Sequence, residues 1–129
     1  MITSISLFNP ISFGQRYKDN GGNPDLKALW DKGKLPIEYG FYGDKLTWDN
    51  ISREHLEPKS LGGTKRFGNI VLASKSKNNA RGNRPIQEFI DMAAAKLYLK
   101  QFEGMTSPIN GNRYIQAVKK TLKFLGIKL

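Results

Sequence analysis

The stretch that decides the fold is residues 53–85, REHLEPKSLGGTKRFGNIVLASKSKNNARGNRP. It predicts an extended arm over residues 50–56, which Pro58 stops because proline offers no N–H to a strand ladder. Glycine and several cations mark residues 59–68 as an exposed loop. The apolar run at residues 70–73 is typical of a buried strand.

Local signals predict further elements on both sides of this strand pair. Polar and basic residues 74–83 indicate a short helix that ends at Gly82. Residues 23–25, Asn-Pro-Asp, have the order of an N-cap, a proline in the first turn and an early acid, so a helix should follow and close at Gly33. Residues 45–48 predict the start of the strand that continues into the arm.

The last third of the chain predicts two helices. Between Pro85 and Phe102, apolar residues recur at three- and four-residue steps, which indicates one long helix. Its inward face is predicted to comprise Ile86, Phe89, Ile90, Ala93, Leu97 and Tyr98. The final helix should turn Ile115, Val118, Leu122 and Leu125 inward and Lys119, Lys120 and Lys123 outward. The whole chain, residues 1–129, is therefore expected to be one α+β domain.

The chain of 129 residues carries a formal net charge of +10, and the excess is regional. Residues 50–84 hold eight basic against two acidic groups, and residues 100–129 hold six against one. A polyanion is the expected partner, with nucleic acid ahead of a membrane surface. No stretch approaches the roughly 20 apolar residues of a membrane span, and the first residues lack a basic signal region, so we expect a soluble, cytoplasmic protein that does not bind membranes.

The few non-basic polar residues at the centre of the chain form a specific pattern. The pair Glu54-His55 precedes Pro58 and Gly62-Gly63, Asn69 opens the apolar strand, and residues 78–82 read Asn-x-x-Arg-Gly. Each part alone is a weak signal, but the joint spacing resembles the HNH endonuclease family.

That resemblance implies a ββα-metal (HNH) core at about residues 44–84. Residues 1–43 would form an N-terminal helical segment, and residues 85–129 a C-terminal helical extension. The small size, with no recognisable sequence-reading module, resembles phage-encoded or mobile-element members of the family, which implies low or borrowed sequence specificity.

The resemblance also implies a role for each polar residue in hydrolysing a phosphodiester bond in DNA. The one histidine, His55, would take a proton from water, since an unperturbed imidazole has a pKa near 6.5 and is largely neutral at cellular pH. Glu54 and Asn78 would offer oxygen ligands to one Mg²⁺ or Mn²⁺ ion. Asn69 would hold the loop and the histidine in orientation.

Cations around this centre could neutralise the phosphates of duplex DNA without reading bases. The predicted contacts are Lys59, Lys65, Arg66, Arg81 and Arg84. The lysines of the final helix are as compatible with a solvated face as with DNA contact.

One departure from the family pattern concerns zinc. Many members carry two Cys-x-x-Cys pairs, but the chain has no cysteine, and the corresponding positions are residues 39–43 and 74–78. We therefore expect no structural zinc, and instead a cluster of buried aromatic side chains at about 1.5–3 kcal/mol each. The predicted members of this cluster are Tyr39, Phe41, Tyr42 and Trp48.

Several alternatives stay open from the sequence. Asn79 could be the ligand in place of Asn78, Glu54 could form an ordinary surface ion pair, and Asn69 could simply form a turn at the strand edge. The domain could also bind nucleic acid without cutting it, or cut RNA, because no residue reports on the 2′-hydroxyl. The sequence gives no indication of the oligomeric state.

Overall fold

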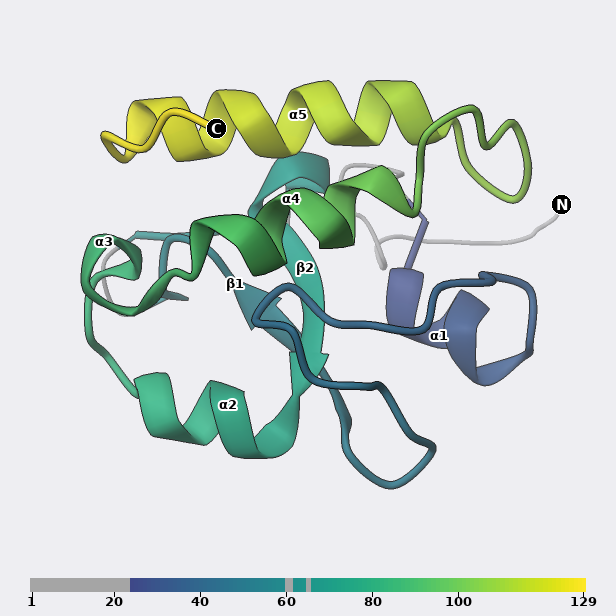
Figure 1. The fold of residues 1–129 in the computed structure, drawn as a ribbon, viewed down its shortest axis with the longest axis horizontal. Coiled ribbons are helices and arrows are strands. Elements are labelled where there is room, and N and C mark those ends of the chain that lie inside the picture. Colours follow the sequence, from purple (N-terminus) through teal and green to yellow (C-terminus); the bar gives the residue numbers. More distant parts are fainter. Residues whose placement is uncertain (1–23, 60–61, 65) are drawn as a thin grey trace, which may run out of the picture.

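The computed structural model describes residues 24–59, 62–64 and 66–129. Figure 1 shows a small β-hairpin in the middle of the molecule, with α2 at one end and α4 and α5 at the other. In chain order the elements are α1 (Leu26–Asp31), β1 (Ile51–His55), the short 3-10 helix η4 (Phe67–Asn69), β2 (Ile70–Ser74), α2 (Lys75–Arg81), α3 (Ile86–Phe89), α4 (Met92–Lys100) and α5 (Gly111–Phe124). The fold is α+β.

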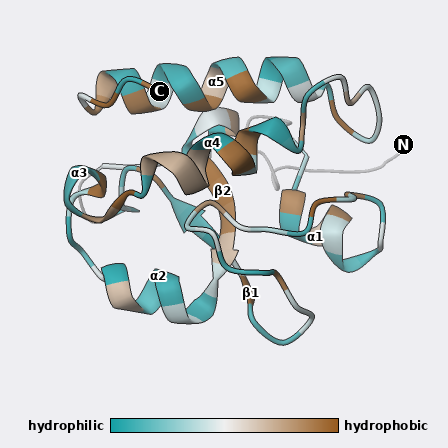
Figure 2. Cartoon of the chain, viewed as in Figure 1, coloured by the Kyte–Doolittle hydropathy of each residue, from teal (hydrophilic) through white to brown (hydrophobic). Residues whose placement is uncertain are grey.

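The hairpin pairs β1 with β2 in antiparallel register, from Ile51 opposite Ser74 to His55 opposite Ile70. The two strands confirm the arm and the apolar run, and Figure 2 shows β2 as an apolar strand. The predicted strand over residues 45–48 is wrong. Lys45 forms only an isolated bridge to Tyr39, and residues 47–50 form a turn in which side-chain hydrogen bonds replace a strand ladder.

The short helix α2 confirms the prediction for residues 74–83. Ser74 ends β2 and caps α2, because its hydroxyl accepts a hydrogen bond from the Lys77 N–H at 3.2 Å. Gly82 ends the helix with a φ of +56°. At the other end of the described chain, the cap of α1 is Asp25, whose side chain accepts from the Ala28 N–H. The predicted N-cap at residue 23 lies outside the described residues.

The single helix predicted between Pro85 and Phe102 is wrong, because the chain breaks it into α3 and α4. Ile90 adopts an extended conformation, with φ −67° and ψ 139°, and the Asp91 side chain caps α4 by accepting from the Ala94 N–H. The break rotates the second half, so Leu97 is 64% exposed rather than buried. The buried face consists of Ala95, Tyr98, Leu99 and Phe102.

The final helix α5 confirms its predicted faces. Ile115, Val118 and Leu122 are buried in the core and Leu125 packs against it, whereas Lys119, Lys120 and Lys123 are exposed. No helix in the described part of the chain is long and apolar enough to cross a membrane.

Two buried tyrosines join the C-terminal helices to the hairpin. The Leu72 N–H donates to the Tyr98 hydroxyl at 3.1 Å, the two hydroxyls of Tyr98 and Tyr114 lie 2.9 Å apart, and the Tyr114 hydroxyl donates to the Ile70 carbonyl at 2.7 Å. Burial raises the pKa of both tyrosines, so the hydroxyls remain donors. α4 and α5 thereby fix the position of β2, and with it the residue opposite His55.

Candidate functional site

A cleft of about 330 Å³ opens where β1 ends and α2 ends. Its lining consists of Glu54, His55, Pro58, Lys59, Arg81, Gly82 and Asn83, and we call it the His55 cleft. The two segments that form it are far apart in sequence and meet because the hairpin brings α2 back beside β1. Two neighbouring residues of the predicted centre, Glu54 and His55, therefore share one cleft.

His55 is the last residue of β1 and is half-buried. Its backbone carbonyl accepts a hydrogen bond from Arg81 Nη1 at 2.7 Å, so the main chain at this position is anchored to α2. The next residue, Leu56, is fully buried, and its carbonyl accepts from Arg81 Nη2 at 2.8 Å. The histidine therefore stands on a fixed backbone at the wall of the cleft.

Glu54 points to the opposite side of the strand from Arg53 and lies in a buried polar cluster. Its Oε2 accepts a hydrogen bond from the Tyr42 hydroxyl at 2.7 Å and forms an ion pair with Arg81 Nη1 at 3.3 Å. Burial raises the pKa of the Glu54 carboxyl, because desolvation outweighs the stabilisation by Tyr42, by Arg81 and by the His55 N–H. Burial and the charge of Glu54 also raise the pKa of Tyr42, so its hydroxyl remains a donor.

Arg81 occupies a different place from the one predicted for it. It was expected to lie at the surface and contact phosphates, but only 1% of its surface is exposed. Its guanidinium donates to three backbone carbonyls, those of His55, Leu56 and Arg84, and also pairs with Glu54. The planar fork of an arginine suits such a set of acceptors, and Arg81 acts as an internal brace between α2 and β1.

Asn78 lies one turn before Arg81, beside the other end of β1. Its Nδ2 donates to the Ser52 hydroxyl at 2.9 Å and to the Arg53 carbonyl at 3.1 Å. Asn78 is not among the residues that line the His55 cleft, and Asn79 is exposed on α2. The structure therefore brings Glu54 and His55 together at the cleft, whereas Asn78 on α2 bonds to β1 beside it.

The contacts of Glu54 and Asn78 do not form a site for a divalent ion as they stand. Such an ion prefers several converging oxygen ligands, whereas the Glu54 carboxylate is occupied by a cation and a hydroxyl. Among the described residues, no group of three or more His, Cys, Asp and Glu side chains could hold a metal. The ligand roles of Glu54 and Asn78 stay predictions.

Asn69 is buried at the start of β2 and connects both sides of the preceding loop. Its Oδ1 accepts from the Glu57 N–H at 2.8 Å, and its Nδ2 donates to the carbonyls of Thr64 at 2.7 Å and of Glu57 at 3.2 Å. Its own carbonyl accepts from the Leu56 N–H at 2.9 Å. These bonds fix the segment directly after His55, which is the arrangement that an orienting residue requires, while its part in catalysis stays a prediction.

Comparisons with protein-family models, with curated proteins and with solved structures found no match.

The remaining predicted cations occupy different surroundings. Lys59 is exposed at the His55 cleft. Arg84 is also exposed, where it donates to the Ala80 carbonyl and lies over the Phe89 ring at 4.8 Å. Arg66 is exposed and lines a separate groove against α5, and Lys65 lies outside the described residues.

One member of the cleft, Asn83, was missed from the sequence. It is exposed and follows Gly82, whose positive φ turns the chain away from α2 and toward the cleft. The signal in the sequence is the Gly-Asn pair directly after the helix, of which the glycine alone predicts the helix end.

The expected aromatic cluster is partly correct. Phe41 and Tyr42 are buried, with ring centroids 5.4 Å apart in an edge-to-face arrangement, and Tyr42 meets Phe89 in the same way at 5.0 Å. Trp48 is 73% exposed, and Tyr39 is also exposed, so these two do not belong to it. Trp48 lies outside because the segment that carries it is a turn and not a strand facing the core.

Proposed function

We propose that this chain is an HNH-type endonuclease that hydrolyses phosphodiester bonds in DNA, with His55 as the general base. The observation that carries the proposal is the half-buried histidine at the wall of a cleft, on backbone held by Arg81 and beside a loop held by Asn69. A base must keep its position relative to the phosphorus atom, and both supports serve that requirement.

In this proposal each residue of the cleft has a separate task. The His55 imidazole accepts a proton from the attacking water. The exposed ammonium of Lys59, in the same cleft, attracts a phosphate and holds it near the water, and Arg84 adds positive charge close to the end of α2. Asn69 keeps Pro58 and Lys59 beside the histidine through its bonds to the loop.

Because of the resemblance to the HNH family, we also propose that cleavage depends on Mg²⁺ or Mn²⁺. When bound, such an ion would stabilise the charge that develops on the phosphate and on the departing oxygen. Glu54 is paired with Arg81 and the Asn78 amide bonds to β1, so the dependence on an ion rests on the resemblance and is tested by chelation.

The test measures conversion of supercoiled plasmid to nicked and linear forms, with Mg²⁺, with Mn²⁺ and with EDTA. We expect cleavage that requires a divalent ion and that falls by at least about 100-fold in His55→Ala, the usual contribution of a general base. Lys128→Ala, a change at an exposed lysine outside the cleft, is the matched control and should cut like the wild type. Cleavage that His55→Ala retains in full would refute the proposed role.

A second function, nucleic-acid binding without turnover, is favoured by one observation. The Glu54 carboxylate pairs with Arg81 and the Asn78 amide bonds to β1, an arrangement suited to a scaffold that no longer holds an ion. Salt-sensitive DNA binding with no cleavage under any divalent ion would establish this function instead. Parallel digestion of single-stranded RNA and duplex DNA separates a ribonuclease from the proposed enzyme.

A further inference from the structure

A second groove, of about 460 Å³, lies between η4 and α5. Its lining consists of Arg66, Phe67, Gly68, Ala117, Lys120, Thr121 and Phe124, and we call it the Phe124 groove. Phe124 is 77% exposed, the most exposed of the large apolar side chains in the described residues, and Arg66 and Lys120 are exposed cations in the same groove. An exposed aromatic ring and two exposed cations in one groove match the two parts of a nucleotide, its base and its phosphate.

The groove is preformed rather than flexible. An ideal Cβ at Gly68 would lie 2.3 Å from the Ala117 carbonyl oxygen. η4 therefore packs so closely against α5 that only glycine fits at this position. The Phe67 ring is held from behind by Tyr114, with centroids 5.1 Å apart. One wall of the groove is therefore rigid, while the Phe124 ring on the other wall faces solvent.

The groove is also close to the His55 cleft along the chain. Phe67 precedes Ile70 by three residues, and Ile70 is paired with His55 across the hairpin. Three residues of chain and one strand pair separate the Cα atoms of Phe67 and His55, so these two atoms lie at most about 16 Å apart. A few nucleotides of a DNA strand span a distance of that order.

We propose that the Phe124 groove binds an unpaired nucleotide of the DNA strand a few positions from the cut, with its base on Phe124 and its phosphates on Lys120 and Arg66. This inference rests on the proposed nuclease function and specifies its substrate class as DNA with a single-stranded segment. A base inside a duplex is already stacked on both faces, so only an unpaired base has a face to offer the ring.

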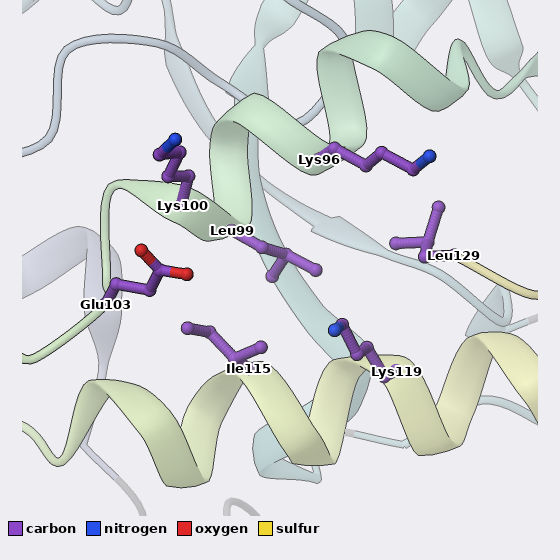
Figure 3. A pocket seen from close by; sticks show the side chains of 7 residues that line it. All are labelled: Lys96, Leu99, Lys100, Glu103, Ile115, Lys119 and Leu129. Atoms are coloured by element: carbon purple, nitrogen blue, oxygen red, sulfur yellow. The ribbon is translucent and has the colours of Figure 1, made fainter.

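A second basic cleft provides a matched control. Lys96, Lys100 and Lys119 line a cleft of about 230 Å³ between α4 and α5, and Figure 3 shows them around Leu99 and Ile115. This cleft has three lysines and one acidic residue, Glu103, but no aromatic residue in its lining. Lys119 is the chain neighbour of Lys120 on α5, so the two lysines differ in the cleft they line and not in helix or charge.

The experiment measures binding of fluorescently labelled oligothymidylate and of a blunt duplex of equal length by anisotropy, in EDTA so that no strand is cut. We expect Phe124→Ala to weaken binding of the single strand by about tenfold or more and to change duplex binding less than twofold. Lys120→Ala should also weaken single-strand binding and reduce its salt dependence, more than Lys119→Ala does. Phe124→Trp should restore the affinity, and Leu97→Ala, at an exposed apolar residue of α4, should change neither.

Three results would overturn the inference: equal losses for the single strand and the duplex, equal effects of the two lysine variants, or a wild-type dimer that Phe124→Ala dissociates. Because binding is measured without a divalent ion, these results are independent of whether the protein cuts. If the groove binds single strands and His55→Ala cuts plasmid normally, only the proposed catalytic function fails.

Discussion

Replacing Arg81 by lysine separates an internal brace from a DNA contact. Both residues carry one positive charge, so a phosphate contact through charge alone would survive the change. The structure assigns Arg81 to the interior, where its planar fork bonds to carbonyls of His55, Leu56 and Arg84 at 2.7, 2.8 and 2.9 Å. A single ammonium cannot reach three acceptors that are spread over the width of a guanidinium.

The expected loss of stability follows from those bonds. Lysine could keep one or two of them, so at least one charge-assisted hydrogen bond disappears and a buried carbonyl is left without its donor, at about 1.5–3 kcal/mol for each. The ammonium must also be desolvated beside Glu54. Together these effects should lower the free energy of unfolding by about 3–5 kcal/mol, a large part of the 5–15 kcal/mol typical of a domain.

Thermal and urea denaturation followed by circular dichroism measure this loss. At about 2.1 cal/mol/K of unfolding entropy per residue, a chain of 129 residues should lose about 10–20 °C in Tm. The matched control is Arg84→Lys, a neighbouring arginine that is exposed and should change stability by less than about 1 kcal/mol. If Arg81→Lys melts like the wild type, and Arg81→Met loses only DNA affinity, Arg81 is a phosphate contact and the brace is refuted.

Two further predictions concern the loop and the first helix. Asn69→Ala removes three side-chain hydrogen bonds to Glu57 and Thr64, so it should lower the free energy of unfolding by about 2–4 kcal/mol and speed proteolysis of the segment that follows His55. Asn79→Ala, at the exposed face of α2, is the control and should be nearly neutral. Equal melting temperatures of the two variants would contradict the role of Asn69. Burial alone would raise the pKa of Asp25, but hydrogen bonds and the charge of Arg53 lower it below its ordinary 3.8. The stability that this carboxylate contributes is therefore present above pH 3.8 and is lost as the pH falls through the pKa of the folded state. Asp25→Asn keeps the cap and should weaken the loss of stability at acid pH, and an identical loss in both proteins would count against this prediction.

The sequence predicted the elements whose signals are local and strong. The apolar run became β2, the cap and glycine around α2 set its ends, and the three-residue and four-residue spacing of α5 placed Ile115, Val118 and Leu122 in the core. In each case one side-chain period or one cap decides the conformation, and the tertiary structure agrees with it.

The failures arose where a polar side chain competes with a periodic pattern. Apolar spacing across residues 86–98 favoured one helix, but the Asp91 carboxylate offers a cap that starts a new one, and the rotation exposes Leu97. The position of Arg81 could not be predicted either. An arginine after a run of basic residues suggests a surface, and only the fold reveals that a carboxylate and three carbonyls surround it.

The spacing Asn78-x-x-Arg81 has a structural explanation that is independent of chemistry. Residues three apart on a helix lie on one face, and residues two apart on a strand lie on one side. Asn78 therefore contacts Ser52, and one helical turn later Arg81 contacts Glu54. The motif therefore records how α2 docks on β1, and a chain that had lost all activity would still need it to fold. Evidence for catalysis must therefore come from activity measurements on residues of the His55 cleft outside this set of side-chain contacts, namely His55 itself and the exposed Lys59 and Asn83.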